Sequence, residues 1–174
     1  MIKSEGVVRP APPMIQATAR VLRNIIEIRV GEVLWECRPV QASQEGLGSR
    51  IAALFSQDYQ TFVPPATDRV HSTVTYTRKN DEIRIRVGEE TWRTVSSAFG
   101  PMTIDYHGVS YSINERLTGR FVIARGAEPV GVGQLGFRSC TIDQYPPELE
   151  PFLANLALGY VIRTLAWEMF FAAG

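Results

Sequence analysis

Two charged side chains stand in an otherwise apolar segment near the end of the sequence. Arg163 and Glu168 lie between Phe152 and Ala173, where nearly every other residue is hydrophobic. A charge inside a protein needs a partner, because burying it alone costs on the order of several kcal/mol. Their spacing of five residues is poor for a pair on one helix, where three or four is favoured. We expect each to be a structural buried charge that reaches a polar group on a strand, or Arg163 to lie near a barrel mouth. A ligand pocket beside Arg163 is the functional alternative.

A second group of charges is basic. Arg84 and Arg86 alternate with isoleucine and valine, so they share one face of a strand, and Arg78 and Lys79 precede them. If Arg93 also points outward, up to five cations converge. Arginine pairs with phosphate oxygens through two parallel hydrogen bonds, so this group is a candidate site for an anionic phospholipid headgroup. The alternative is a solvated outer face that neighbouring acidic residues neutralise.

Other residue types that could do chemistry lack the context for it. His71 and His107 stand in no metal-ligand spacing, and the chain has no GxSxG nucleophile motif. The glycines of "GVGQLG", residues 131–136, lack the GxGxxG spacing and more often mark a bend or a close approach of backbone to a packed helix. Cys37 and Cys140 are expected to be small buried apolar residues. The sequence thus predicts no catalytic residue, no metal site and no cofactor, and it argues against an enzyme.

Composition sets the broad class. The chain has 174 residues, 45% of them apolar, and 18 basic residues balance 18 acidic ones. A net charge of zero argues against nucleic-acid binding, which needs an excess of cations. The length suits one domain over residues 1–174, with 1–19 as a loosely ordered segment. The first residues contain no apolar run of signal-peptide length, so we expect a cytoplasmic protein, with peripheral membrane contact as an option.

A repeated phrase predicts the elements that position these residues. "IEIRVGEVLW" begins at Ile26 and "IRIRVGEETW" at Ile83, with seven of ten positions identical. Apolar residues alternate with polar ones before each glycine, which is typical of a strand with one buried face. Glycine accepts the positive φ that a tight hairpin requires. Each copy is therefore predicted to be a β-hairpin.

The remaining segments extend this pattern. Three further hairpins are expected, with turns at residues 79–81, at His107–Gly108 and near Gly126, and "FRSCTI" is expected to add a strand. The interior helix candidate is "SRIAALFSQDYQ", residues 49–60. About nine or more short antiparallel strands with hairpin spacing indicate a mostly β protein and a closed barrel.

The C-terminal segment is different. "YPPELEPFL" has the prolines and acidic residues of a helix start, and the polar residues that follow are scattered around the helix axis. A helix that is apolar on all sides lies in a core or in a membrane. Arg163 would sit near the middle of a membrane span, at a cost of roughly 2.5–3.5 kcal/mol. We therefore predict that residues 148–173 form a central hydrophobic helix inside the barrel, with a membrane tail as the alternative.

The order of these elements resembles the tubby C-terminal-like superfamily. The features that carry the resemblance are the many short strands, the strand pair "RFVIARGAEPVGVGQL" and the proline-marked start "YPPELEPFL" of an apolar terminal helix. This superfamily includes the LURP-one-related proteins and the phospholipid scramblases. The resemblance covers roughly residues 20–174, most clearly the last 55, and it rests on the order of elements. It implies a closed antiparallel barrel around a hydrophobic C-terminal helix, in proteins that bind lipids or partners. No functional residue is carried over from the family.

Three functions are consistent with these observations. The first is a non-enzymatic barrel that binds an anionic membrane lipid or a protein partner. The second is a small-molecule carrier or enzyme with a pocket at one barrel mouth. The third is a β domain tethered to a membrane by its C-terminal helix.

Overall fold

Twelve strands and one long helix make up the part of the chain that the computed structural model describes, which is residues 14–20, 25–40, 58–96 and 100–172. The strands are β1 Met14–Arg20, β2 Ile25–Val30, β3 Val33–Pro39, β4 Asp58–Phe62, β5 Ser72–Thr77, β6 Glu82–Val87, β7 Glu90–Val95, β8 Met102–Tyr106, β9 Val109–Glu115, β10 Arg120–Arg125, β11 Glu128–Gly136 and β12 Ser139–Asp143. The helical elements are η2 Arg78–Asn80, η3 Pro147–Leu149 and α2 Glu150–Ala172.

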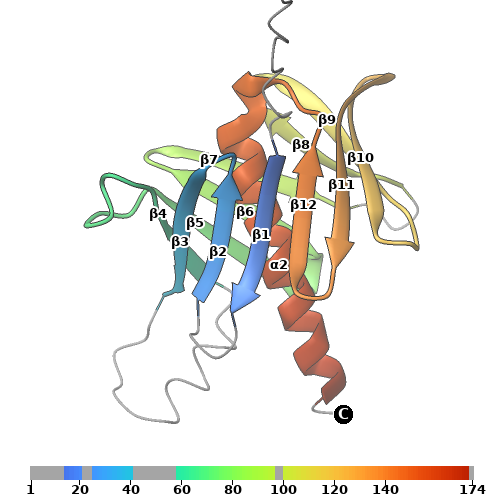
Figure 1. Ribbon diagram of the computed structural model, residues 1–174. Helices are drawn as coiled ribbons and strands as arrows, with labels where there is room; N and C mark the ends of the chain where they lie inside the picture. Colours follow the sequence, from blue (N-terminus) through green and yellow to red (C-terminus); the bar gives the residue numbers. More distant parts are fainter. Residues whose placement is uncertain (1–13, 21–24, 41–57, 97–99, 173–174) are drawn as a thin grey trace, which may run out of the picture.

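The strands form a closed antiparallel barrel (Figure 1). Each strand pairs with its neighbours in sequence, and β1 closes the barrel by pairing with β12. Closure removes the exposed edges that invite pairing with another chain. The prediction of a mostly β protein with a closed barrel is confirmed, and the strand count is higher than the approximate nine expected.

The repeated phrase forms two equivalent hairpins, β2–β3 and β6–β7. Gly31 and Gly88 occupy the turns with φ of +57° and +59°, a conformation that glycine adopts without steric cost. In β6, Ile83 and Ile85 are fully buried while Arg84 and Arg86 face outward, so the period-two pattern reports the barrel's inside and outside. The predicted turns at residues 79–81, at His107–Gly108 and near Gly126 are present as well.

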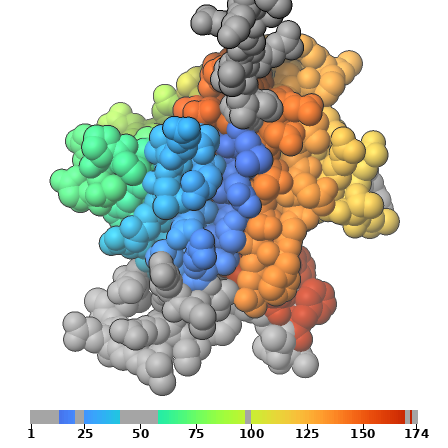
Figure 2. All heavy atoms as spheres, in the orientation of Figure 1, coloured from blue at the N-terminus to red at the C-terminus, as the bar shows by residue number. Residues whose placement is uncertain are grey.

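Helix α2 runs through the barrel, and its last turns extend past the strand ends (Figure 1). Residues 152–162 are all buried, which explains why no polar stripe is visible in the sequence. In the space-filling view, β1–β3 and β11–β12 cover the front, and the red C-terminal part of α2 emerges below them (Figure 2). The predicted central helix is confirmed, and the short helix η3 directly precedes it in the chain. None of the helices in the described part of the chain is long and apolar enough to span a bilayer.

A buried polar chain ties the helix to the barrel wall. Asn155 of α2 accepts a hydrogen bond from Ser72 of β5, and Ser72 also bonds to Thr61 of β4. Nδ2 of Asn155 donates to the carbonyl oxygen of Pro151 at 2.8 Å. All three side chains are at most 2% exposed, so losing any partner would leave a buried polar group unsatisfied. This hydrogen-bond network fixes the position of α2 along the barrel axis.

Two expectations from the sequence need correction. Residues 14–19 were assigned to a loosely ordered segment, but they belong to β1, which closes the barrel; residues 1–13 lie outside the described residues. The helix expected over residues 49–60 is wrong at its end, because Asp58–Phe62 forms β4. The rest of that segment, residues 49–57, lies outside the described residues.

Candidate functional site

Three arginines gather on the outer surface of β6 and β7. Arg84 of β6 stands directly opposite Arg93 of β7 in the antiparallel register, and Arg86 shares their face. Arg86 and Arg93 are exposed, and the Arg84 side chain is 43% exposed. Like charges directly opposite one another on a sheet destabilise it. We call these three residues the outer arginine face.

Threonines flank the outer arginine face on both sides. Thr73 and Thr75 of β5 pair with Arg86 and Arg84, and Thr91 of β7 pairs with Arg86 from the other side. Cross-strand neighbours have Cβ atoms about 4.5–5.5 Å apart, so the hydroxyls lie within reach of a group bound by the guanidinium ions. Hydroxyl donors beside arginine forks are a combination that suits phosphate oxygens.

Glu82 partly neutralises this face. Nη2 of Arg84 donates to Oε1 of Glu82 at 2.9 Å. Nε of Arg84 is buried and has no hydrogen-bond partner among the described residues. Arg84 is therefore only partly satisfied by the described residues.

The other two predicted cations lie elsewhere. Arg78 and Lys79 are exposed in η2, the turn that joins β5 to β6 at the end of the barrel. The predicted group is thus divided, with Arg84 and Arg86 joined by Arg93 on the outer face and Arg78 and Lys79 at the barrel mouth.

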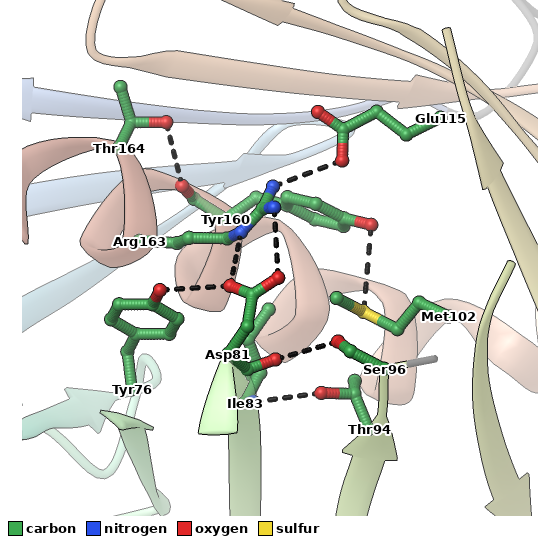
Figure 3. Close-up of polar contacts among 10 residues, drawn as sticks. All are labelled: Tyr76, Asp81, Ile83, Thr94, Ser96, Met102, Glu115, Tyr160, Arg163 and Thr164. Atoms are coloured by element: carbon green, nitrogen blue, oxygen red, sulfur yellow. Dashed lines mark hydrogen bonds and ion pairs between the residues drawn. The ribbon is translucent and has the colours of Figure 1, made fainter. Parts of the chain in front are cut away.

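Arg163 lies at the same end of the barrel, between two carboxylates (Figure 3). Its Nε and Nη2 donate to Oδ1 and Oδ2 of Asp81 at 2.8 and 3.1 Å, and Nη1 donates to Oε2 of Glu115 at 3.0 Å. The Tyr76 hydroxyl donates to the same Oδ1 of Asp81 at 2.8 Å, and Ser96 donates to the Asp81 carbonyl oxygen. Arg163 thus lies near a barrel mouth, which is the second of the two alternatives, and its partners are in the β5–β6 turn and at the end of β9. Its side chain is 21% exposed, so it is partly buried and not fully buried as expected.

The electrostatics of this cluster favour the charged forms. Burial disfavours the Arg163 guanidinium, but the hydrogen bonds and charge of Asp81, with the charge of Glu115, outweigh it and raise the Arg163 pKa. Burial likewise opposes ionisation of Asp81, yet the hydrogen bonds from Arg163, Tyr76 and Ser96 hold its pKa below the usual value. Each ion is therefore stabilised by its partner rather than by water.

A cavity of about 410 Å³ opens beside Arg163. Its polar lining includes Asp81, Ser96 and Glu115, and its apolar lining includes Met102 and Ile113. The sequence predicted the possibility of a pocket beside Arg163 but none of its lining. Asp81 and Glu115 are separated from Arg163 by 82 and 48 residues, so no local spacing could reveal the contact. We call this space the mouth cavity.

Glu168 also finds a partner on another element. Its Oε2 accepts a hydrogen bond from Nε of Arg138 at 3.0 Å. Arg138 lies in the turn between β11 and β12, and both side chains are about one-third exposed. This pair fastens the emerging part of α2 to the barrel wall.

The histidines and cysteines have structural surroundings. His107 bonds to Glu90 at 3.0 Å and stacks on Tyr106, and His71 packs edge-on against Trp35. Cys37 and Cys140 are free and fully buried, as expected, and burial raises the pKa of both thiols. Within the described ranges, no three His, Cys, Asp or Glu side chains are placed to hold a metal ion.

Comparison of the chain with protein-family models, with curated proteins and with solved structures finds no match. The resemblance to the tubby C-terminal-like superfamily therefore stays a prediction.

Proposed function

We propose that this protein is a non-catalytic binding protein that recognises an anionic phosphate-bearing group, such as a phospholipid headgroup, on its outer arginine face. The observation that carries the proposal is the direct cross-strand pairing of Arg84 with Arg93. Such a pair costs stability in the free protein and gains it when an anion bridges the two guanidinium ions. A barrel enclosing a C-terminal helix is also what the resemblance to tubby-like proteins implies, which supports a lipid ligand.

Vesicle binding tests this proposal. We expect the protein to co-sediment with phosphatidylcholine vesicles that also contain phosphatidylserine or a phosphatidylinositol phosphate, and not with phosphatidylcholine alone. Binding should weaken as salt is raised, because exposed charges are screened. The double variant Arg86→Gln/Arg93→Gln should bind about 30-fold more weakly, since each cation near an anionic surface contributes about 1 kcal/mol.

A matched control separates the site from net charge. Arg38 and Arg125 are exposed arginines of other strands, paired with Glu36 and Glu128. The variant Arg38→Gln/Arg125→Gln removes the same charge and should retain binding. Equal losses in the two double variants would overturn the proposal.

The source of the phosphate is a separate question. Soluble inositol phosphate or inorganic phosphate that displaces the protein from vesicles and binds it alone would indicate a free ligand. Binding to vesicles without displacement would indicate a membrane surface, where several headgroups act together. Absence of binding to both would refute an anion site.

A further inference from the structure

The mouth cavity carries a charge opposite to that of the outer arginine face. Two carboxylates, Asp81 and Glu115, share one guanidinium, Arg163, so the cavity lining has a formal charge of minus one. Figure 3 shows both Asp81 oxygens bonded, whereas one oxygen of Glu115 has no bond to any of the residues drawn. The Glu115 side chain is 36% exposed, so a solute can reach it. An anionic ligand would meet two carboxylates here, and a cationic ligand would complete the charge balance.

The rest of the lining limits the shape of the ligand. Most of the exposed lining is polar and includes Asn114, whereas Met102 and Ile113 are 8% and 1% exposed and add little apolar surface. Ser96 supplies a hydroxyl, although it already donates to the carbonyl oxygen of Asp81. A volume of about 410 Å³ is at the small end of the range for ligand pockets, which is about 300–1,000 Å³. The site therefore fits a small ligand with a charged head.

The network around Arg163 holds the charged part of the cavity lining in place. The guanidinium of Arg163 pairs with Asp81 on one side and with Glu115 on the other. Asp81 also accepts a hydrogen bond from Tyr76. The Tyr160 hydroxyl donates to the sulfur of Met102 at 3.9 Å. Side chains fixed in this way lose little conformational entropy when a ligand arrives. The charged part of the lining is thus preformed.

We infer that the mouth cavity binds a small organic cation, a primary amine, whose ammonium group pairs with Glu115. This site is separate from the outer arginine face and takes a ligand of opposite charge. It gives the protein a second binding function, beyond the one proposed above.

Three probes of the same shape and different charge test the inference. Phenethylamine is a cation at neutral pH, phenethyl alcohol is neutral and hydrocinnamate is an anion. In NMR titrations of the labelled full chain, phenethylamine should shift the resonances of Ser96, Glu115 and Arg163 saturably. The alcohol should bind more weakly, and hydrocinnamate most weakly. Glu115→Gln should weaken phenethylamine binding about tenfold, because it removes a hydrogen bond between charged groups.

The control is Glu128→Gln, which makes the same charge change on an exposed glutamate of β11 that pairs with Arg125. It should leave phenethylamine binding unchanged. Failure of phenethylamine to bind, equal binding of the three probes, or equal effects of the two glutamate variants would each overturn the inference. None of these outcomes involves Arg84, Arg86 or Arg93 of the outer arginine face, so the two sites can fail independently.

Discussion

Replacing Asp81 with asparagine is expected to lower the free energy of unfolding by about 2–3 kcal/mol. Asparagine has the same shape and tolerates the left-handed backbone of this position, where φ is +48°. The substitution therefore removes the charge that pairs with Arg163 and leaves the turn intact. Breaking a fully buried ion pair costs about 3–5 kcal/mol, and the 21% exposure of the Arg163 side chain reduces that figure. Urea unfolding followed by circular dichroism measures the change.

Glu115→Gln is the matched comparison for this prediction. It removes the other carboxylate of Arg163, but Glu115 is more exposed and accepts a single hydrogen bond from it. We expect a loss of less than about 1 kcal/mol, as for other partly exposed ion pairs. Equal losses in the two variants would contradict the view that Asp81 is the main partner of Arg163.

The pH dependence of stability gives a second test of the same pair. The pKa of Asp81 is lower in the folded protein than its usual value of 3.8, which approximates the unfolded chain. The unfolded state therefore takes up the proton first, and the contribution of Asp81 is complete above that value and is lost as the pH falls through the folded pKa. The stability difference between wild type and Asp81→Asn should be constant near neutral pH and shrink below about pH 4. A difference that stays constant into this acidic range would mean that Asp81 does not act through its charge.

The fold was predictable where apolar residues alternate regularly with polar or charged ones. The alternation of Ile83 and Ile85 with Arg84 and Arg86 identifies a strand and also shows which face is buried. The glycine that follows the strand identifies the turn. The central helix was predictable for the opposite reason. A segment with apolar residues on every side must be surrounded, and a barrel is a structure that surrounds it.

Two strands escaped prediction because their inward residues are weakly apolar. In β1, the core position after Ile15 is Ala17, a small residue that gives little hydrophobic contrast. In β4, the inward residues are Tyr59 and Thr61, and Thr61 is a polar residue that bonds to Ser72 within the core. Thr61 belongs to the polar network that positions α2, and its polarity is the reason that β4 does not look like a strand in the sequence.

The candidate sites were predictable to different degrees. Arg84 and Arg86 share a face by local periodicity alone, but their pairing with Arg93 depends on the register across the hairpin. The partners of Arg163 depend on closure of the whole barrel, which brings the β5–β6 turn and the end of β9 to one mouth. Contacts of that kind require the tertiary structure.

Gly133 of β11 is the glycine of the "GVGQLG" segment with the closest neighbour. It stands opposite Phe121 of β10, and a Cβ atom at this position would overlap the Phe121 ring. That ring is fully buried and stacks on Tyr160 of α2 with centroids 5.0 Å apart. The sequence predicted that a glycine of a strand lies close to the packed helix. In the structure, the Phe121 ring lies between Gly133 and α2.

Gly133→Ala is therefore expected to destabilise the protein by about 3 kcal/mol, at the upper end of the usual range for overpacking, because the Phe121 ring has no free space to enter. Gly131→Ala is the control, since its Cβ would meet Ile123 at an ordinary 3.5 Å and should change stability by about 0.5 kcal/mol or less. Combining Gly133→Ala with Phe121→Leu should restore part of the loss, with a coupling of about 1–2 kcal/mol in a double-mutant cycle. Denaturant unfolding of the four proteins of that cycle provides the measurement. Additive effects would mean that Gly133→Ala destabilises the protein through the backbone and not through a clash with the Phe121 ring.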